Sequence, residues 1–294
     1  MLDSVARGGY SRYMRSFYII LLAAVVSLAV SLALPLFKAD SPAQHDGGTA
    51  YDRVMKTGVL RCGYFVLDGY LHKDMESGAL GGPAYEIIEA LAKIISVKVE
   101  WVQEAAFASI GEDLKQGRYD MMCAPLLPNG PRSRVMAMSR PVWWQPLTIW
   151  LNKDDARLSD TPEWLNAPET KFSVIDGTGF PTVVSSFYPQ AGMVALPEMT
   201  AISEMFLELT GRKVDALLMM HYPAVKYAAR NDGAIVQYTN RIVSYLPYRF
   251  AWAKGDQKMA EMVDIALEEL VYTGVINNIL DKYDPEGIFY KRPE

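Results

Sequence analysis

The sequence predicts an α/β protein of two lobes joined by a two-strand hinge and preceded by one N-terminal transmembrane helix. Three observations carry this prediction: an uncharged N-terminal segment, two successive units of alternating strands and helices, and two long extended runs around the second unit. Alternating strands and helices form parallel sheets covered by helices. The extended runs lead the chain out of the first lobe and back into it, which leaves a cleft between the lobes.

The overall composition excludes several classes of protein. The 294 residues are 50% hydrophobic and 21% charged, which suits a globular protein with a sizeable core. A formal net charge of -5 argues against a sequence-independent grip on nucleic acid, so we expect no nucleic-acid partner. The histidines and cysteines have no metal-site spacing, and no P-loop or catalytic triad pattern occurs. We therefore expect no metal, no cofactor and no catalytic residue.

Residues 17–37, FYIILLAAVVSLAVSLALPLF, carry no charge, and as a helix they can cross a hydrocarbon core of about 30 Å. Arginines dominate the residues before this segment, so 1–16 should stay in the cytoplasm and the rest should lie on the far side of the membrane, anchored by the helix. Cleavage as a signal peptide, giving a secreted protein, is the alternative. Residues 38–50 are small and polar and predict a flexible linker.

The first unit begins near residue 51 and alternates strand, helix, strand, helix, strand. A short apolar run and a period-two alternation predict the first two strands, and helical spacing predicts the helices, the second ending at Gly117. We place the first lobe at residues 51–146 plus 247–294. Its expected alternating elements are 58–65, 83–96, 97–103, 107–117 and 119–125.

The second unit repeats the alternation, and we place this lobe at residues 147–246. The extended runs 143–155 and 244–256 flank it as hinge strands, and one long helix at 258–283 closes the chain. The expected elements between the runs, strand and helix in turn, are 171–179 with its glycine turn, 180–188, 192–197, 201–211, 214–220, 223–231 and 234–238.

The order and spacing of these segments resemble the periplasmic solute-binding proteins that deliver amino acids to ABC importers, the extracellular solute-binding proteins of family 3. The resemblance covers about residues 51–287 and rests on GVLRCG, LKQGRYDMM, PRSRVMAMSRP and VDALLMMHYPAVKY, among other pieces. It implies the type II periplasmic-binding-protein fold and a non-enzymatic function. The implied ligand is a small carboxylate, an amino acid or a more apolar relative, held between the lobes, and the implied partner is an ABC transporter permease.

The resemblance also implies which residue holds the ligand carboxylate. The family's binding arginine matches Arg132 in the segment LPNGPRSRVMAMSRP, and Asn129 and Leu127 lie on the same loop. A planar guanidinium offers two parallel donors to the two carboxylate oxygens. Arg134 and Arg140 have no such role in the family pattern.

A second carboxylate-binding element is implied at 176–180, DGTGF. A glycine turn before a helix exposes backbone N–H groups, and the helix dipole favours an anion there. Gly177 would supply such a group, and Thr178 would add its hydroxyl.

The sequence departs from the family pattern where the ligand ammonium is usually held. The family has an aspartate after the strand at 214–220, and Met220 or His221 stands there in this chain. An ordinary amino acid would then need Asp68, Glu86 or His221 for its ammonium, because an unpaired buried charge is costly. We expect a pocket more apolar than is usual, lined by Phe65, Phe107, Pro125, Leu127, Trp143 and Met220.

Two other functions remain as alternatives. The same fold hosts periplasmic dehydratases, and such an enzyme would need a general acid, for which the candidates are Glu86, Asp68 and His221. A membrane-anchored ligand sensor domain is the other alternative, and it would need a separate partner for its output.

Cys62 and Cys123 are expected on neighbouring strands of the first lobe. We favour two buried thiols, because a direct bridge between adjacent parallel strands often has poor geometry. A disulfide formed in an oxidising compartment is the alternative.

Overall fold

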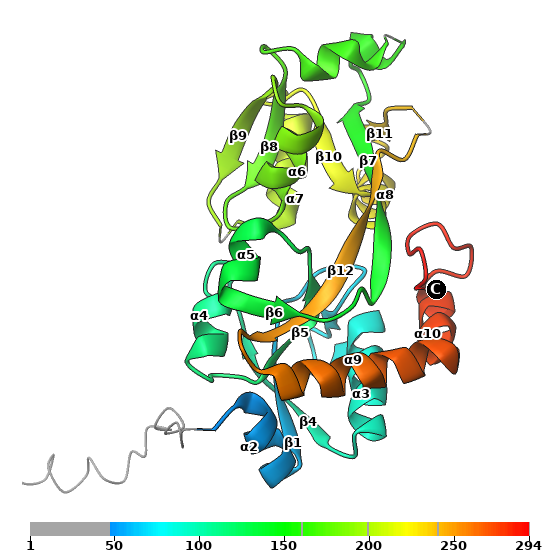
Figure 1. Ribbon diagram of the computed structural model, residues 1–294. Coiled ribbons are helices and arrows are strands. Elements are labelled where there is room, and N and C mark those ends of the chain that lie inside the picture. The colour runs from blue at the N-terminus through cyan, green and yellow to red at the C-terminus, as the bar shows by residue number, and fades with distance from the viewer. Residues whose placement is uncertain (1–47, 160, 199, 240, 294) are drawn as a thin grey trace, which may run out of the picture. The chain divides into compact units, whose positions relative to one another are not determined.

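The structure is a computed structural model of the chain that describes residues 48–159, 161–198, 200–239 and 241–293. The described residues fold into two lobes of strands and helices (Figure 1). Within the described ranges, we find no helix with the length and apolar character needed to span a membrane. The predicted transmembrane segment, residues 17–37, lies outside those ranges.

Parallel strands form the centre of the first lobe. β1 (Val59–Tyr64) lies between β4 (Lys98–Glu104) and β5 (Met121–Leu126) and runs parallel to both. Every side chain of β5 is buried, which accounts for its unbroken apolar run. β4 alternates half-buried and exposed positions, as an edge strand with one covered face does.

Helices pack against this sheet and against one another. α3 (Pro83–Ile94) begins with a proline, whose missing N–H costs nothing in the first helical turn, and buries an apolar stripe against β5. α9 (Gln257–Tyr272) and α10 (Val275–Tyr283) pack against α3, and α2 (Ala50–Thr57) packs against α9. The remaining elements of this lobe are α4 (Ile110–Lys115), α5 (Gly130–Val135), β2 (His72–Lys73), β3 (Leu80–Gly81) and β6 (Met136–Met138).

The second lobe has its own parallel pair. β8 (Lys171–Ile175) runs parallel to β9 (Gly192–Leu196), and a parallel bridge between Phe172 and Ala216 joins β8 to the chain just before β10 (Leu217–Met220). The other elements here are α6 (Phe180–Phe187), α7 (Ile202–Thr210), α8 (His221–Arg230), β11 (Ile235–Gln237) and the 3-10 helices Ala156–Ser159 and Pro162–Asn166.

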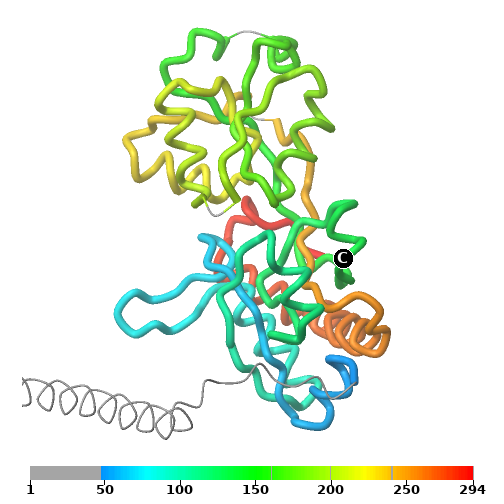
Figure 2. Tube along the Cα trace, turned by 90° about the vertical axis from the view of Figure 1, so that its left-hand side faces the viewer, coloured from blue at the N-terminus to red at the C-terminus, as the bar shows by residue number. Residues whose placement is uncertain are grey.

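Two long strands connect the lobes. β7 (Trp143–Asn152) and β12 (Ser244–Ala253) pair antiparallel, with Tyr248 opposite Trp143. β12 continues along β5 and β6 in the first lobe, whereas β7 continues along β10 and β11 in the second. Figure 2 shows both strands, green and orange, running from one lobe to the other. They are the two extended runs that the sequence indicates as hinge strands.

The single helix expected at 258–283 is two helices, so that prediction is wrong. α9 ends at Tyr272 and α10 begins at Val275, with Gly274 between them at a φ of 75°. Glycine adopts this left-handed conformation without a steric penalty, and the chain changes direction there.

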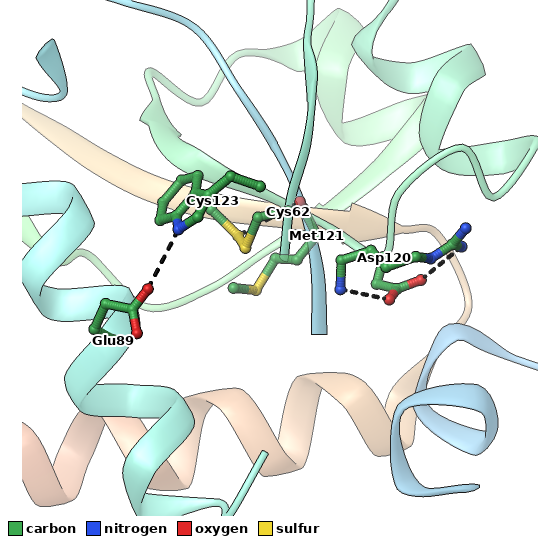
Figure 3. The surroundings of a disulfide bond; sticks show 7 residues. Cys62, Glu89, Asp120, Met121 and Cys123 are labelled. Carbon is green, nitrogen blue, oxygen red and sulfur yellow. Dashed lines mark hydrogen bonds and ion pairs between the residues drawn. A yellow bond between two sulfur atoms is a disulfide. The ribbon is translucent and has the colours of Figure 1, made fainter. Parts of the chain in front are cut away.

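The two cysteines form a disulfide, so the preference for free thiols is also wrong. Cys62 on β1 and Cys123 on β5 are bonded, with their Cα atoms 5.4 Å apart (Figure 3). Cys62 is paired with Met121, and Cys123 two positions further on points to the same face of the sheet. That separation lies within the range that a disulfide bridges without backbone movement, so the expected obstacle is absent at this pair.

Candidate functional site

A small cavity lies between the two lobes. Its volume is about 50 Å³, whereas pockets that enclose drug-sized ligands measure about 300–1,000 Å³. A ligand therefore fits only if the lobes or the lining side chains move outward. The lining residues are Phe65, Leu67, Phe107, Pro125, Leu126, Leu127, Arg132, Thr178, Gly179, Phe180, Ile202, Met220, Leu246 and Tyr248.

Arg132 is held by α5, a short helix where the sequence suggested a loop. The side chain of Asn129 caps this helix by accepting from the backbone N–H of Arg132 at 2.9 Å, and Pro131 stands in its first turn. The sequence Asn-Gly-Pro at 129–131 already contains the cap and the proline. A helix of six residues, however, is too short for its apolar periodicity to be recognised. The cap fixes the direction in which Arg132 leaves the backbone.

The guanidinium of Arg132 reaches both lobes. Nη1 donates to the carbonyl oxygen of Leu127 at 2.6 Å, and Nη2 donates to that of Gly177, which follows β8, at 3.2 Å. The residue is only 7% exposed. Burial lowers the pKa of Arg132, and the neighbouring Tyr248 acts in the opposite direction. Among the described residues, no carboxylate forms an ion pair with this guanidinium.

The glycine turn of the second lobe faces Arg132. Gly177 has a φ of 73°, and Thr178 donates its hydroxyl to the carbonyl oxygen of Ile175 at 2.5 Å. The hydroxyl oxygen accepts from the N–H of Phe180 at 3.3 Å, at the start of α6. A β-carbon on Gly179 would lie 2.4 Å from Cδ2 of Leu127, so the lobes approach each other closely here.

The rest of the cavity wall is mainly apolar. The rings of Phe65 and Phe107 lie 4.8 Å apart between their centroids, and Met220 is buried at the end of β10. Tyr248 is the remaining lining residue with a polar side chain besides Arg132 and Thr178, and burial raises its pKa to about 12. Tyr248 is therefore neutral near pH 7, and its hydroxyl is engaged with that of Tyr70.

The structure brings together seven of the residues that the sequence analysis placed in the site: Phe65, Phe107, Pro125, Leu127, Arg132, Thr178 and Met220. Gly177 lines a wider groove of about 910 Å³ that adjoins them and shares Arg132 and Phe107. Asn129 is not among the residues that line the cavity, and it acts indirectly by capping the helix that carries Arg132. Trp143 does not line the cavity, because its ring is fully buried against Tyr70, Tyr248 and Tyr290.

The polar groups suggested for a ligand ammonium lie elsewhere. Asp68 pairs with Arg230 at 3.2 Å, and Glu86 accepts hydrogen bonds from Lys282 and Tyr283. His221 packs between the rings of Trp150 and Phe289, and burial lowers its pKa. Within the described ranges, no group of three His, Cys, Asp or Glu residues is arranged to hold a metal ion.

The sequence analysis missed several lining residues. Leu246 and Tyr248 come from β12, two positions apart and therefore on one face of the strand. Gly179 and Phe180 belong to the element at 176–180 that the sequence analysis placed at the site, although neither was named there as a lining residue. The others are Leu67, Leu126 and Ile202.

Comparisons of the sequence and of the fold with known proteins point to one family. The sequence profile of the bacterial extracellular solute-binding proteins, family 3, matches residues 70–286. No curated protein sequence is detectably similar to the chain.

Several solved structures share the fold. An ancestral amino acid-binding protein, described as a precursor of cyclohexadienyl dehydratase, is 27% identical with a TM-score of 0.67, covering 80% of this chain and 99% of its own. A mutant of an arginine-binding protein from T. maritima is 23% identical with a TM-score of 0.66, covering 81% and 100%. An amino acid ABC transporter substrate-binding protein from Streptococcus pneumoniae, bound to L-arginine, is 19% identical with a TM-score of 0.65, covering 84% and 100%.

Proposed function

This chain belongs to the bacterial extracellular solute-binding proteins of family 3, and from that premise we propose that it captures a small carboxylate between its lobes and delivers it to an ABC importer. Arg132 is the group that holds the carboxylate. The amino acid-binding relatives support a ligand of this size and charge.

One observation carries the assignment of Arg132. Its guanidinium is buried, and among the described residues it has carbonyl partners but no carboxylate partner. A buried charge without an opposite charge is destabilising, and a ligand anion relieves this penalty. Because a guanidinium carries five N–H donors and the two carbonyls use two of them, donors remain for a carboxylate.

Other groups complete the proposed site. The proposed backbone donors are the N–H groups of Gly177, Gly179 and Leu127, since that of Thr178 already donates to the carbonyl oxygen of Ile175. The hydroxyl of Thr178 can rotate from the same carbonyl toward a ligand oxygen. Phe65, Phe107 and Met220 would contact the body of the ligand.

Binding is coupled to closure in this account. Arg132 lies in the first lobe, and its hydrogen bond to Gly177 O connects it to the second. A ligand that contacts Arg132, Leu127 and the glycine turn stabilises the closed arrangement and shifts the population toward it. The hinge strands β7 and β12 would carry this motion, with lobe boundaries near residues 147 and 246.

We also propose that the protein works on the periplasmic side of the membrane, attached by residues 17–37. The uncharged segment and the arginines before it support the anchor. N-terminal sequencing of the mature protein tests this directly: a chain that begins after residue 30 would be a secreted protein.

The geometry favours binding over catalysis. Asp68, Glu86 and His221, the candidate acids of an enzyme of this fold, do not line the cavity, and the two carboxylates are engaged with Arg230 and Lys282. Because the described lining residues include no carboxylic acid and no histidine, no acid-catalysed elimination is assigned to them.

The test is to identify the molecule that remains on the purified full-length protein by mass spectrometry. We expect a small carboxylate on the wild type and none on Arg132→Ala. Small-angle scattering should show a smaller radius of gyration when that molecule is added back to protein from which it was removed. A retained molecule without a carboxylate, kept equally by Arg132→Ala, would refute the proposal.

A further inference from the structure

We infer that the ligand is an amine-free, apolar monocarboxylate with a net charge of -1, in place of a zwitterionic amino acid. This inference rests on the proposed function and specifies the ligand class of the same site. It follows from the charges, the free acceptors and the walls of the cavity.

The cavity supplies one positive charge and, among its described lining residues, no negative one. Arg132 is the charged lining residue, and the polar lining residues Thr178 and Tyr248 are neutral. A monocarboxylate anion therefore brings the closed site to neutrality. An amino acid zwitterion leaves a net positive charge in a buried space, and arginine with its cationic side chain leaves a larger one.

The carbonyl oxygens near the carboxylate position each already accept at least one hydrogen bond, and none of them carries a formal negative charge. The carbonyl oxygens of Leu127 and Gly177 accept from Arg132, and that of Ile175 accepts from Thr178. Met220, which is 3% exposed at the end of β10, presents a thioether that cannot pair an ammonium. An α-ammonium beside the carboxylate would enter this space without a carboxylate among the described lining residues to balance its charge.

Carboxylates do occur near the turn, but they are not among the residues that line the cavity. A β-carbon on Gly177 would lie 3.0 Å from Oε2 of Glu198, and both Glu198 and Asp176 are exposed and absent from the cavity lining. Glu198 is therefore the strongest competing partner for an ammonium, and the experiment includes it.

The walls favour an apolar body. Three phenylalanine rings, from Phe65, Phe107 and Phe180, and the aliphatic side chains of Leu127 and Ile202 surround the space. Apolar surface buried there is stabilising, whereas a hydroxyl or amine on the body would lose its water without gaining a partner.

Matched pairs of probes test the inference on the full-length wild-type protein. L-phenylalanine is compared with hydrocinnamate, and L-leucine with isocaproate, because the members of each pair differ only in the amino group. We expect isothermal titration calorimetry to show the amine-free acid of at least one pair binding about a hundredfold or more tightly than its amino acid. L-arginine should bind no better than the amino acids of the pairs.

Two variants make the comparison sharper. Met220→Asp places a carboxylate in the wall and should reverse the preference, weakening hydrocinnamate and strengthening L-phenylalanine. Glu198→Gln should change neither affinity. Because Met220 is buried, the folding of its variant is checked by thermal unfolding, and the wild-type pairs give an answer that does not depend on it.

The outcomes separate the two proposals. An amino acid that binds as tightly as its amine-free partner, or an amine on the molecule retained by the wild type, overturns the ligand class and leaves carboxylate capture intact. Loss of amino acid binding in Glu198→Gln would identify the overlooked ammonium partner. Failure of all four acids to bind also overturns the ligand class, whereas a retained molecule indifferent to Arg132→Ala overturns the proposed function itself.

Discussion

Arginines that are at least half-buried occur in two regions of the first lobe, and their positive charges are balanced differently. Beside the sheet, Asp120 (Figure 3) is 1% exposed, accepts from Nη2 of Arg61 at 3.1 Å and forms an ion pair with Arg53. It also accepts from the backbone N–H of Arg61 at 2.9 Å. In the cleft, Arg132 has only carbonyl partners among the described residues. In the first region the arginine charges are neutralised by a carboxylate of the chain itself. In the second, the charge of Arg132 is neutralised only when an anion binds.

This difference indicates which charged residues stabilise the fold and which bind the ligand. Removing Asp120 or one of its arginine partners should lower the stability of the fold and leave ligand affinity unchanged, because none of these residues lines the cavity. Changing the cleft should affect binding and leave stability almost unchanged. The disulfide beside Asp120 belongs to the first region, since Cys62 and Cys123 lie on the same two strands.

The largest effect on stability is expected from that disulfide. It joins residues separated by 61 positions, and closing a loop of this length in the unfolded chain contributes about 4 kcal/mol in the chain-entropy description. Chemical denaturation of Cys62→Ala/Cys123→Ala should show a loss of this order, with ligand affinity retained. Reductant should destabilise the wild type and have no effect on the double variant. Equal free energies of unfolding for the wild type and the double variant would show that the disulfide does not stabilise the fold.

The second-largest loss of stability is expected from Asp120→Ala. It leaves Arg53 and Arg61 without their shared carboxylate, and a broken buried pair costs about 3–5 kcal/mol. We expect about 3 kcal/mol, because the arginine side chains are 29% and 20% exposed and water replaces part of the interaction. Denaturant titration measures the loss. A fall in ligand affinity with unchanged stability would mean that the two regions have been interpreted the wrong way round.

A smaller effect is expected in the cleft from Gly179→Ala. The new methyl group would lie 2.4 Å from Cδ2 of Leu127 in the closed arrangement, and its three nearest atoms there all belong to Leu127 of the first lobe. Because the end of a leucine side chain can move, we expect a cost of about 1 kcal/mol, or about fivefold in affinity. Gly192→Ala is the matched control, since its nearest neighbour there lies at 3.5 Å. Calorimetry that shows equal affinities would place the lobes further apart in the bound state.

The sequence predicted regular elements better than their ends and interruptions. Parallel strands and amphipathic helices repeat over enough residues to be recognised, as in α3 and β5. The break at Gly274 depends on one residue, and α5 depends on a cap and a proline. The disulfide could not be predicted because it depends on the register of β1 against β5.

The candidate site was predictable in its charged part and less so in its walls. Arg132 and the glycine turn stand in recognisable motifs. Trp143 and Tyr248 both lie in long extended runs, and a run of large side chains does not reveal which face meets the cleft. The structure buries Trp143 among aromatic rings and directs Tyr248 to the cavity.

The comparison of Arg132→Ala with Arg134→Ala tests the central claim most directly, with both ligand affinity and the stability of the ligand-free protein measured for each. Loss of the buried cationic partner should cost about 2–5 kcal/mol of binding, which is roughly 30- to several-thousand-fold in affinity. The free energy of unfolding without ligand should stay the same or rise, because an unbalanced buried charge has been removed. Arg134→Ala should change neither quantity. If Arg132→Ala instead keeps full affinity and loses about 3 kcal/mol of stability, Arg132 is a structural cation like Arg61, and the site lies elsewhere.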